Sequence, residues 1–568
     1  MKPQGRALRA AVLILLMGGF VLPILAGFGQ TAGAAFGYLP VLGADSLSLD
    51  PWRALFALPG MATSLRLTLV TGIGSTLLAL VLAAGFCAFA HGRMTASGMA
   101  RLLTPFLAAP HAALAIGLAF LLAPSGWIAR LVSPWATGWD RPPDLATVND
   151  QWGVALILGL LIKEVPFLLL VMGSALGQLP LRQHLAAGRA LGYARGVTWV
   201  KVILPQVYPL IRLPIFVTLA FALSVVDMAI ILGPSNPPTL SVATTRWFSA
   251  PDIALILPAS AAALLQIGLV LGAVGLWICA ERILRRVGLW WLRRGGRGHP
   301  TEPGLWLAST ATATLMAMGL AALCALLLWS FAWRWSYPDA LPQSWSTKFW
   351  LSPGKGWGEA LKTTLLLGLA STALSLTLAI AWLEGEDQAG TPRAGWATAL
   401  IYLPLLTPQL GFLYGLNVVF LQIGISGGMG AVIWAQMLFV FPYVMIALSD
   451  PWRALDPRQI RAAASLGASP ARRLFAVKLP MLLRPLLTAA AIGFAVSVAQ
   501  YLPTLFMGAG RIATLTTEAV TLSSGSDRRI TGTYATLQAA LPFLAYGVAF
   551  LIPAILYRNR RGLLGTPT

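Results

Sequence analysis

Few residues in this chain could take part in chemistry, and two of them lie inside long apolar segments. Asp227 follows Ser224-Val225-Val226, and Gln500 follows Ser497-Val498-Ala499 at nearly the corresponding place in the second half of the chain. A charged side chain within a membrane span costs about 2.5–3.5 kcal/mol unless it faces water or a partner. We therefore predict that Asp227 and Gln500 face a central path, where a carboxylate would suit a cationic solute. A hydrogen bond to a neighbouring helix explains Asp227 equally well.

No other pattern indicates catalysis or metal binding. The sequence has no Gly-x-x-x-x-Gly-Lys-Ser/Thr phosphate loop, so any ATP that drives this protein must bind to another chain. The cysteines lie in apolar runs without a Cys-x-x-Cys pair or a Cys/His cluster, and the histidines form no motif. We expect no catalytic residue, no metal and no cofactor in this chain. The residues concerned are Cys87, Cys279, Cys324, His91, His111, His184 and His299.

The composition indicates a polytopic membrane protein. Of 568 residues, 57% are hydrophobic and only 10% are charged, and the mean hydropathy is +0.75. These values are too apolar for a soluble protein. The net charge of +21 could suggest nucleic acid. The basic residues, however, lie in short loops between apolar spans, so membrane topology explains them better and we expect no nucleic-acid partner.

The spans are organised around a short segment that occurs twice. In each copy a small-residue run leads to a glycine, and a Leu-Pro pair follows at the same spacing, since 467 − 192 and 480 − 205 both equal 275. Alanine-rich runs form helices with a face that another surface can approach closely, and glycine permits a sharp turn. Proline at the first position of a helix then starts the next span. The defining residues are Ala186, Ala187, Gly188, Gly192 and Pro205 in the first copy, and Arg461, Ala462, Ala463, Gly467 and Pro480 in the second.

This doubled segment resembles the EAA loop of binding-protein-dependent ABC importer permeases, the surface on which the ATPase subunit docks. Two copies in matching register are much stronger evidence than one, because an Ala-rich helix before Leu-Pro is common. The sequence departs from the family at the usual leading Glu, which is Ala186 in one copy and Arg461 in the other. Basic residues nearby are candidates to replace its contact: Arg189, Arg195, Arg472 and Arg473.

The resemblance implies a fused-dimer permease of the Type I (MetI-like) fold, most similar to the thiamine and ferric-iron transporter group. Such a permease passes a small solute from a periplasmic binding protein across the inner membrane, driven by two copies of a cytoplasmic ATPase that holds the ATP. The resemblance does not identify the solute.

Apolar stretches of spanning length occur about twelve times. With a cytoplasmic N-terminus, the cytoplasmic loops and both tails hold about 27 Lys and Arg residues against about 12 outside, so we predict that both termini are cytoplasmic. We predict that the first stretch is an uncleaved anchor, although its basic start could pass for a signal peptide. The stretches lie near 10–30, 64–90, 99–123, 153–176, 206–233, 255–280, 304–332, 360–384, 396–421, 428–449, 481–507 and 533–557.

The sequence predicts that the two halves are parallel six-helix repeats. Thr68 with Gly72 corresponds to Thr364 with Gly368, and Thr239-Leu240 corresponds to Thr514-Leu515. An even number of spans gives both halves the same orientation, which builds a pore between them. The predicted domains are a first anchor with its outer loop (1–63), a type-1 transmembrane domain (64–280), a basic cytoplasmic linker (281–303), a seventh helix with its outer loop (304–359), a second type-1 domain (360–557) and a cytoplasmic tail (558–568).

Two other function classes fit the sequence less well. An ion-coupled secondary transporter could share the parallel repeat, but it would usually place more polar residues and broken helices at the midplane. A membrane-embedded transferase would need a carboxylate or histidine constellation, which this sequence does not contain.

Overall fold

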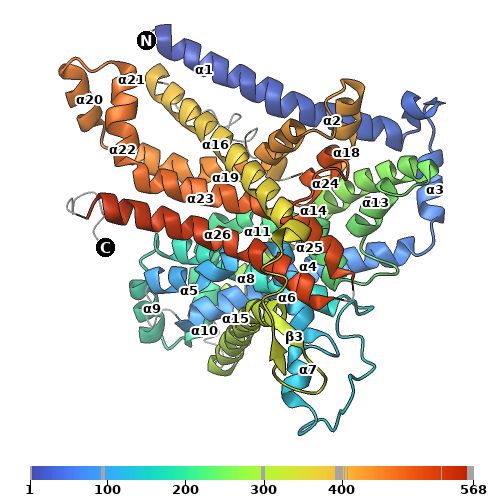
Figure 1. The fold of residues 1–568 in the computed structure, drawn as a ribbon. Helices are drawn as coiled ribbons and strands as arrows, with labels where there is room; N and C mark the ends of the chain where they lie inside the picture. Colours follow the sequence, from blue (N-terminus) through green and yellow to red (C-terminus); the bar gives the residue numbers. More distant parts are fainter. Residues whose placement is uncertain are drawn as a thin grey trace. The chain divides into compact units, whose positions relative to one another are not determined.

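The computed structural model describes residues 3–90, 96–295, 301–390 and 401–558, apart from 402, 406 and 526. Long helices dominate this part of the chain (Figure 1). Ten of them are long and apolar enough to cross a membrane, or eleven if the bent pair Pro470–Met481 and Leu483–Ala499 counts as one span. The prediction of an all-α polytopic membrane protein is confirmed.

The predicted spans and the helices differ at a few places. The stretch 99–123 is divided between α5 (Ala96–Ala108) and α6 (His111–Leu122), because Pro110 between them cannot donate a helical hydrogen bond. The stretch 396–421 lies partly outside the described residues and ends in α18 (Leu410–Gln422). Within the predicted basic linker, residues 281–293 continue the preceding helix α14 (Ile256–Arg293).

The chain forms two compact units. The first-half unit contains residues 31–347 and 522–533, and the second-half unit contains residues 1–30, 348–521 and 534–568. The first predicted span therefore packs with the second half of the sequence, and the seventh packs with the first half. Hydropathy sets the length of a span and not its neighbours, which is why the sequence did not predict this exchange.

The first-half unit is built on α4 (Met61–Ala90), which packs against α8 (Val154–Leu176), α11 (Leu204–Ser224) and α15 (Glu302–Phe331). Small residues permit these close contacts, since a Cβ added at Gly72 would lie 2.6 Å from a methyl of Leu223. Besides α5, α6 and α14, this unit contains α3 (Asp50–Ala57), α7 (Trp127–Val132), α9 (Leu181–Ala190), α10 (Arg195–Thr198), η3 (Trp199–Ile203), α12 (Asp227–Leu232), α13 (Leu240–Phe248), and the short turns η2 (Pro40–Leu42) and η4 (Ile253–Leu255). Its two hairpins pair β1 (Tyr38–Leu39) with β2 (Ala44–Asp45) and β3 (Ala332–Arg334) with β4 (Ser344–Trp345).

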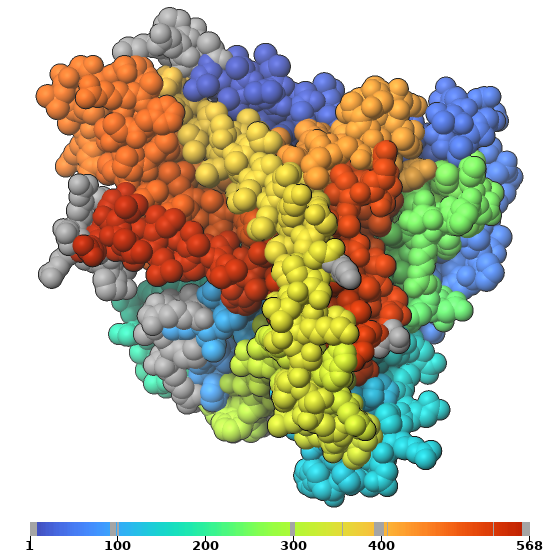
Figure 2. All heavy atoms as spheres, in the orientation of Figure 1, coloured from blue at the N-terminus to red at the C-terminus, as the bar shows by residue number. Residues whose placement is uncertain are grey.

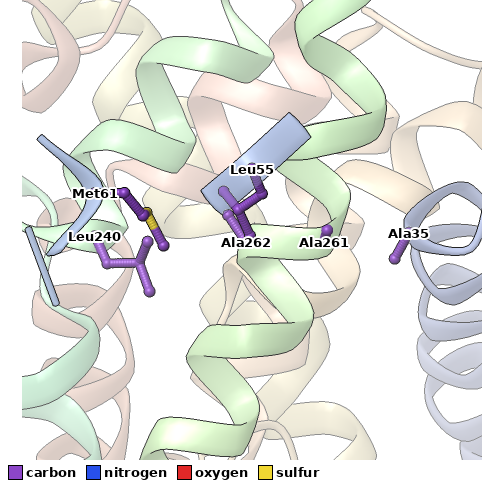
Figure 3. Close-up of a cluster of buried hydrophobic side chains, with 6 residues drawn as sticks. All are labelled: Ala35, Leu55, Met61, Leu240, Ala261 and Ala262. Carbon is purple, nitrogen blue, oxygen red and sulfur yellow. The ribbon is translucent and has the colours of Figure 1, made fainter. Parts of the chain in front are cut away.

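A satellite cluster joins the short helix α3 to this unit. Leu55 on α3 packs with Met61, Leu240 and the Ala261-Ala262 pair of α14, and Figure 3 shows these side chains together with Ala35. Leu55, Leu240, Ala261 and Ala262 are fully buried. Burying a leucine contributes about 1.5–3 kcal/mol, so the cluster holds α3 against α14.

The second-half unit is built on α16 (Trp357–Ala389), α19 (Met429–Arg453) and α23 (Leu483–Ala499), with α1 (Pro3–Leu16) lying along α16. The indole N–H of Trp434 donates to the carbonyl of Gly19 at 2.9 Å, which ties the first span to α19. Besides α18, the remaining elements are η1 (Met17–Val21), most of α2 (Leu22–Ala35), η5 (Pro353–Lys355), α20 (Pro457–Ser465), α21 (Pro470–Arg473), η6 (Leu474–Lys478), α22 (Leu479–Met481), α24 (Leu502–Gly508), α25 (Leu515–Ser523) and most of α26 (Arg528–Leu556).

The same hydrogen bond occurs in both units, between residues that correspond in the two halves of the sequence. The backbone N–H of Leu240 donates to the hydroxyl oxygen of Thr68 at 2.9 Å. In the other unit, the backbone N–H of Leu515 donates to the hydroxyl oxygen of Thr364 at 2.9 Å. Each hydroxyl in turn donates to a carbonyl four residues earlier, at 2.7 Å in both units. A threonine at the start of α4 or α16 thus anchors the first turn of α13 or α25.

Candidate functional site

The first copy of the doubled segment is a helix, a left-handed turn and a second helix. α9 ends near Ala190, and the backbone then turns at Gly192, whose φ is +77°. The N–H of Gly192 donates to the carbonyl of Arg189 at 2.9 Å. The N–H of Tyr193 donates to the carbonyl of Gly188, also at 2.9 Å. This pair of bonds is a Schellman motif, which requires the left-handed conformation that glycine adopts freely.

The second copy has the same backbone conformation. Gly467 has a φ of +81°, and the N–H groups of Gly467 and Ala468 donate to the carbonyls of Ala464 and Ala463, both at 3.0 Å. The ends of α20, α21 and η6 follow those of α9, α10 and η3 by 275 residues. The register predicted from the two glycines therefore extends to each helical turn of the segment.

The copies differ where they enter the next span. Pro205 stands in the first turn of α11, and the helical segment 195–224 is continuous. Pro480 stands in the short α22, after which the chain bends by 78° into α23. The prediction that the proline starts the next span is wrong in both copies: Pro205 lies inside the continuous segment, and Pro480 lies just before the bend, with the next span starting at Leu483. A helical π-turn precedes each proline, so the helix has already begun there, and only the second copy turns sharply.

Apolar side chains are exposed at equivalent places in the two copies. Leu191 and Leu466, which precede the turn glycines, are 62% and 88% exposed. Val200 and Phe475, on the π-helical turns that follow, are 51% and 67% exposed. Figure 2 shows the second copy at the surface, in orange. Large apolar side chains exposed at repeated positions are typical of a protein or membrane interface.

The small residues of the segment take two different roles. Ala186, Ala187, Arg461 and Ala462 are exposed, whereas Gly188 is buried against α10. A Cβ at Gly188 would lie 2.5 Å from the hydroxyl oxygen of Thr198, so glycine there permits the close packing of α9 on α10. The second copy has Ala463 at this position and is more open, since α20 buries no residue.

A buried ionic cluster lies directly behind the second copy. The ammonium of Lys478, on η6, contacts Glu384 at 2.5 Å and Asp387 at 2.6 Å, near the end of α16. The indole N–H of Trp452 donates to Asp387 at 3.0 Å, which brings α19 into the cluster. Arg453 and Glu386 form a further ion pair at 3.0 Å. The cluster joins the end of the second copy to two long helices.

Sequence reasoning missed this cluster because the predicted stretch ends at residue 384, whereas α16 continues to Ala389 and carries Glu384, Glu386 and Asp387 on its last turns. The sequence does contain one indication of the cluster. Lys478 is a lone cation in an apolar run, and a buried ammonium needs a partner.

The first copy is held by other contacts. Lys201, on η3, lies over the ring of Trp291 at 4.4 Å and that of Tyr193 at 5.2 Å. The N–H of Gly196 donates to the Thr301 hydroxyl oxygen at 2.9 Å, just before α15. Position 203, which corresponds to Lys478, is the buried Ile203.

Asp227 and Gln500 both lie at a break in a helix. Asp227 is half-buried and is the first residue of α12, after the non-helical Val225 and Val226. Gln500 follows α23 and is 8% exposed, and its side-chain amide donates to the carbonyl of Gln436 at 3.0 Å. The two residues belong to different units. Each therefore stands where regular hydrogen bonding is interrupted, which is tolerated in a span where backbone lines a cavity or is buried in protein.

Comparison with known proteins shows which protein family this chain matches. Residues 388–559 match the model of the family described as binding-protein-dependent transport system inner membrane component. The inner membrane ABC transporter permease protein YnjC of Escherichia coli (strain K12) is 35% identical over 526 residues, which is 91% of this chain and 93% of YnjC. The similarity to YnjC thus extends over nearly the full length of both chains.

Two further relatives match shorter regions. The putative 2-aminoethylphosphonate transport system permease protein PhnV of Salmonella typhimurium (strain LT2) is 24% identical over 182 residues, covering 31% of this chain and 68% of PhnV. The spermidine/putrescine transport system permease protein PotC of Haemophilus influenzae is 26% identical over 101 residues, covering 18% of this chain and 39% of PotC.

Proposed function

Because this chain belongs to the family of binding-protein-dependent ABC transporter permeases of the inner membrane, we propose that it is the fused permease subunit of an ATP-driven importer. The doubled segment is its docking surface for two copies of a separate ATPase. A periplasmic binding protein delivers the solute, and both termini are cytoplasmic. The observation that carries this proposal is the recurrence of one exposed helix, turn and helix geometry at a constant offset of 275 residues.

The docking surface fits a partner with an acidic groove. Residues 181–203 and 457–478 contain no Asp or Glu, and Arg458, Arg461 and Arg472 are exposed. The exposed side chains of Leu191 and Leu466 would pack on apolar parts of the same partner surface. Contact between exposed opposite charges weakens as salt increases, so association with the ATPase should fall with ionic strength.

The test is copurification of the ATPase with permease variants. Leu191→Asp and Leu466→Asp should each reduce the amount of ATPase recovered with the permease, and the double variant should abolish recovery. Leu351→Asp is the matched control, because Leu351 is 77% exposed but lies outside both copies. Full recovery with the double variant would contradict the docking role. Solute uptake that continues without the ATPase would instead favour an ion-coupled secondary transporter.

The proposal also covers the translocation path and the transported solute. Asp227 and Gln500 line the translocation path, and their unequal chemistry makes that path asymmetric. The sequence resemblance suggests thiamine or ferric iron as cargo, whereas the names of PhnV and PotC refer to 2-aminoethylphosphonate and to spermidine/putrescine. Measuring which of these compounds the partnering binding protein retains, by calorimetry, would select among them.

A further inference from the structure

A cavity of about 460 Å³ in the first-half unit is lined mainly by arginine and tryptophan. Its walls come from the segment after α6, from α7, from the end of α15, from the β3 region and from the start of α26. No part of the doubled segment and neither Asp227 nor Gln500 lines it. Its lining includes Ser125, Arg130, Trp329, Trp335, Asp527 and Arg528.

Arg130 is fixed in the wall of this cavity. The residue is 4% exposed, and its guanidinium donates only to backbone carbonyls, among them those of Ser125 at 3.0 Å and Ser336 at 2.7 Å. Three aromatic rings surround the guanidinium carbon, with centroids at 5.6 Å (Trp329), 5.0 Å (Trp335) and 5.4 Å (Tyr337). Such a group loses little freedom when it binds a ligand, because its position is already determined.

Arg528 brings a second guanidinium to the same place. It donates to the carbonyl of Ser125 at 3.2 Å, which also accepts from Arg130, and to the Ser125 hydroxyl oxygen at 2.9 Å. Its guanidinium carbon lies 5.1 Å from the centroid of Trp329, the ring that Arg130 also faces. Two cations that share an acceptor and a ring repel each other.

The cavity contains too little negative charge to balance these cations. Asp527 lines the wall, but its two carboxylate oxygens accept from Arg529 at 2.9 Å and 2.8 Å. In the part of the chain that the structure describes, neither Arg130 nor Arg528 has a carboxylate within salt-bridge distance. The indole N–H of Trp329, which is 7% exposed, is buried without an acceptor among the described residues. Within the described ranges, four of the five N–H groups of Arg130 already donate to carbonyls, whereas Arg528 uses only two of its five and the Trp329 N–H has no acceptor, so the donors available to a ligand come mainly from Arg528 and Trp329.

We propose that this cavity binds an oxyanion, a carboxylate or phosphate group, which lies between Arg130 and Arg528 with its attached apolar part against the tryptophans. The Arg528 guanidinium keeps N–H groups that can bind such an anion in the planar geometry that guanidinium groups favour, and Arg130 contributes mainly its positive charge. An anion would also remove the repulsion between the two cations. The group is carried either by a small solute or by the headgroup of an anionic lipid, since the cavity lies at the ends of the spans α15 and α26.

The test uses the full chain in nanodiscs of zwitterionic phosphatidylcholine. One arm titrates inorganic phosphate at constant ionic strength, and the other replaces part of the lipid with phosphatidylglycerol. A ligand that binds only the folded state raises the apparent melting temperature with its concentration. A rise with phosphate identifies a free anion, and a rise with phosphatidylglycerol alone identifies a headgroup.

Arg528→Gln should weaken the apparent affinity at least about tenfold, because hydrogen bonds to a charged group contribute about 1.5–3 kcal/mol. Arg528→Lys keeps the charge but loses the planar fork, so it should weaken binding less than Arg528→Gln. It supplies the measurement if Arg528→Gln fails to fold. Arg334→Gln is the matched control, an exposed arginine on β3 outside the cavity, and it should bind as the wild type. The proposal is overturned if neither anion raises the melting temperature, or if Arg528→Gln and Arg528→Lys leave the rise unchanged.

Discussion

The ammonium of Lys478 lies 2.5 Å from a carboxylate oxygen of Glu384, and both side chains are almost completely buried. Lys478 ends the second copy of the doubled segment, and Glu384 belongs to α16, a central helix of its unit. A buried charge is tolerated only when it is paired and hydrogen-bonded. The pair therefore fixes the second copy of the doubled segment to α16, and a movement of one requires a movement of the other.

Replacing Lys478 should destabilise the second-half unit strongly. Lys478→Met leaves the Glu384 carboxylate buried without its cation, and breaking a buried ion pair in this way costs about 3–5 kcal/mol. The measurement is the apparent melting temperature of the purified permease. Adding Glu384→Gln should recover part of the loss, because the remaining carboxylate, Asp387, is 44% exposed and can be hydrated.

Lys362→Met is the control for that experiment. Lys362 pairs with Glu359 at 3.7 Å, and both side chains are more than 70% exposed. Exposed pairs of this kind contribute about 0–1 kcal/mol, so the control should melt close to the wild type. Equal losses from Lys478→Met and Lys362→Met would show that the cluster does not hold the segment.

The doubled segment and the cluster behind it show what the sequence could and could not predict. Gly192 and Gly467 were predictable, because a glycine after a small-residue helix has a local backbone function that needs no knowledge of neighbours. The partners of Lys478 were not, since they depend on how far α16 extends and on which helix faces which. The exchange of the first and seventh spans between the units has the same origin, because hydropathy does not specify contacts.

Backbone conformation should make Gly467 sensitive even to alanine. Its φ is +81°, and nothing lies within 4 Å of an added Cβ. Gly467→Ala therefore causes no steric clash, and its only cost is the strain of an alanine in the left-handed backbone conformation. A non-glycine residue in this conformation costs about 1–2 kcal/mol. Gly74→Ala is the matched control, since Gly74 is helical, also has open space, and should gain up to about 1 kcal/mol from helix propensity. Chemical denaturation should give opposite signs for the two variants, and a common sign would contradict the strain.

The paired threonine bonds should have similar energies in the two units. Thr68→Val and Thr364→Val each leave a buried backbone N–H, of Leu240 or Leu515, without its acceptor, which costs about 1–3 kcal/mol. Thr377→Val is the control, because the Thr377 hydroxyl is exposed and only donates to the carbonyl of Ala373. Each of the first two variants should lower the melting temperature more than the control. A loss for only one of them would show that the bonds are not equivalent.

Acidification should weaken the structure around Asp527. Hydrogen bonds from the Arg529 guanidinium lower the pKa of this carboxyl below its usual 3.8. A carboxyl whose pKa is lower in the folded state stabilises the fold above the unfolded-state pKa, and this stabilisation is lost as the pH falls through the folded-state pKa. The melting temperature of Asp527→Asn should therefore lie below the wild type at pH 6 and approach it below about pH 4. A constant difference down to pH 3 would contradict the pairing.

Asp227 tests the proposed path, because its carboxylate can be neutralised with almost no change in shape. Asp227→Asn should lower solute uptake without lowering the amount of permease in the membrane, since a path residue contacts the solute whereas a packing residue supports the fold. Gln500 offers a comparison of the opposite kind, because its amide donates to Gln436 within the protein, so Gln500→Ala should lower abundance as well as uptake. Uptake by membrane vesicles, normalised to immunoblotted permease, separates the two effects. Unchanged uptake by Asp227→Asn would assign that carboxylate to packing at the break between α11 and α12 and leave the path to other residues.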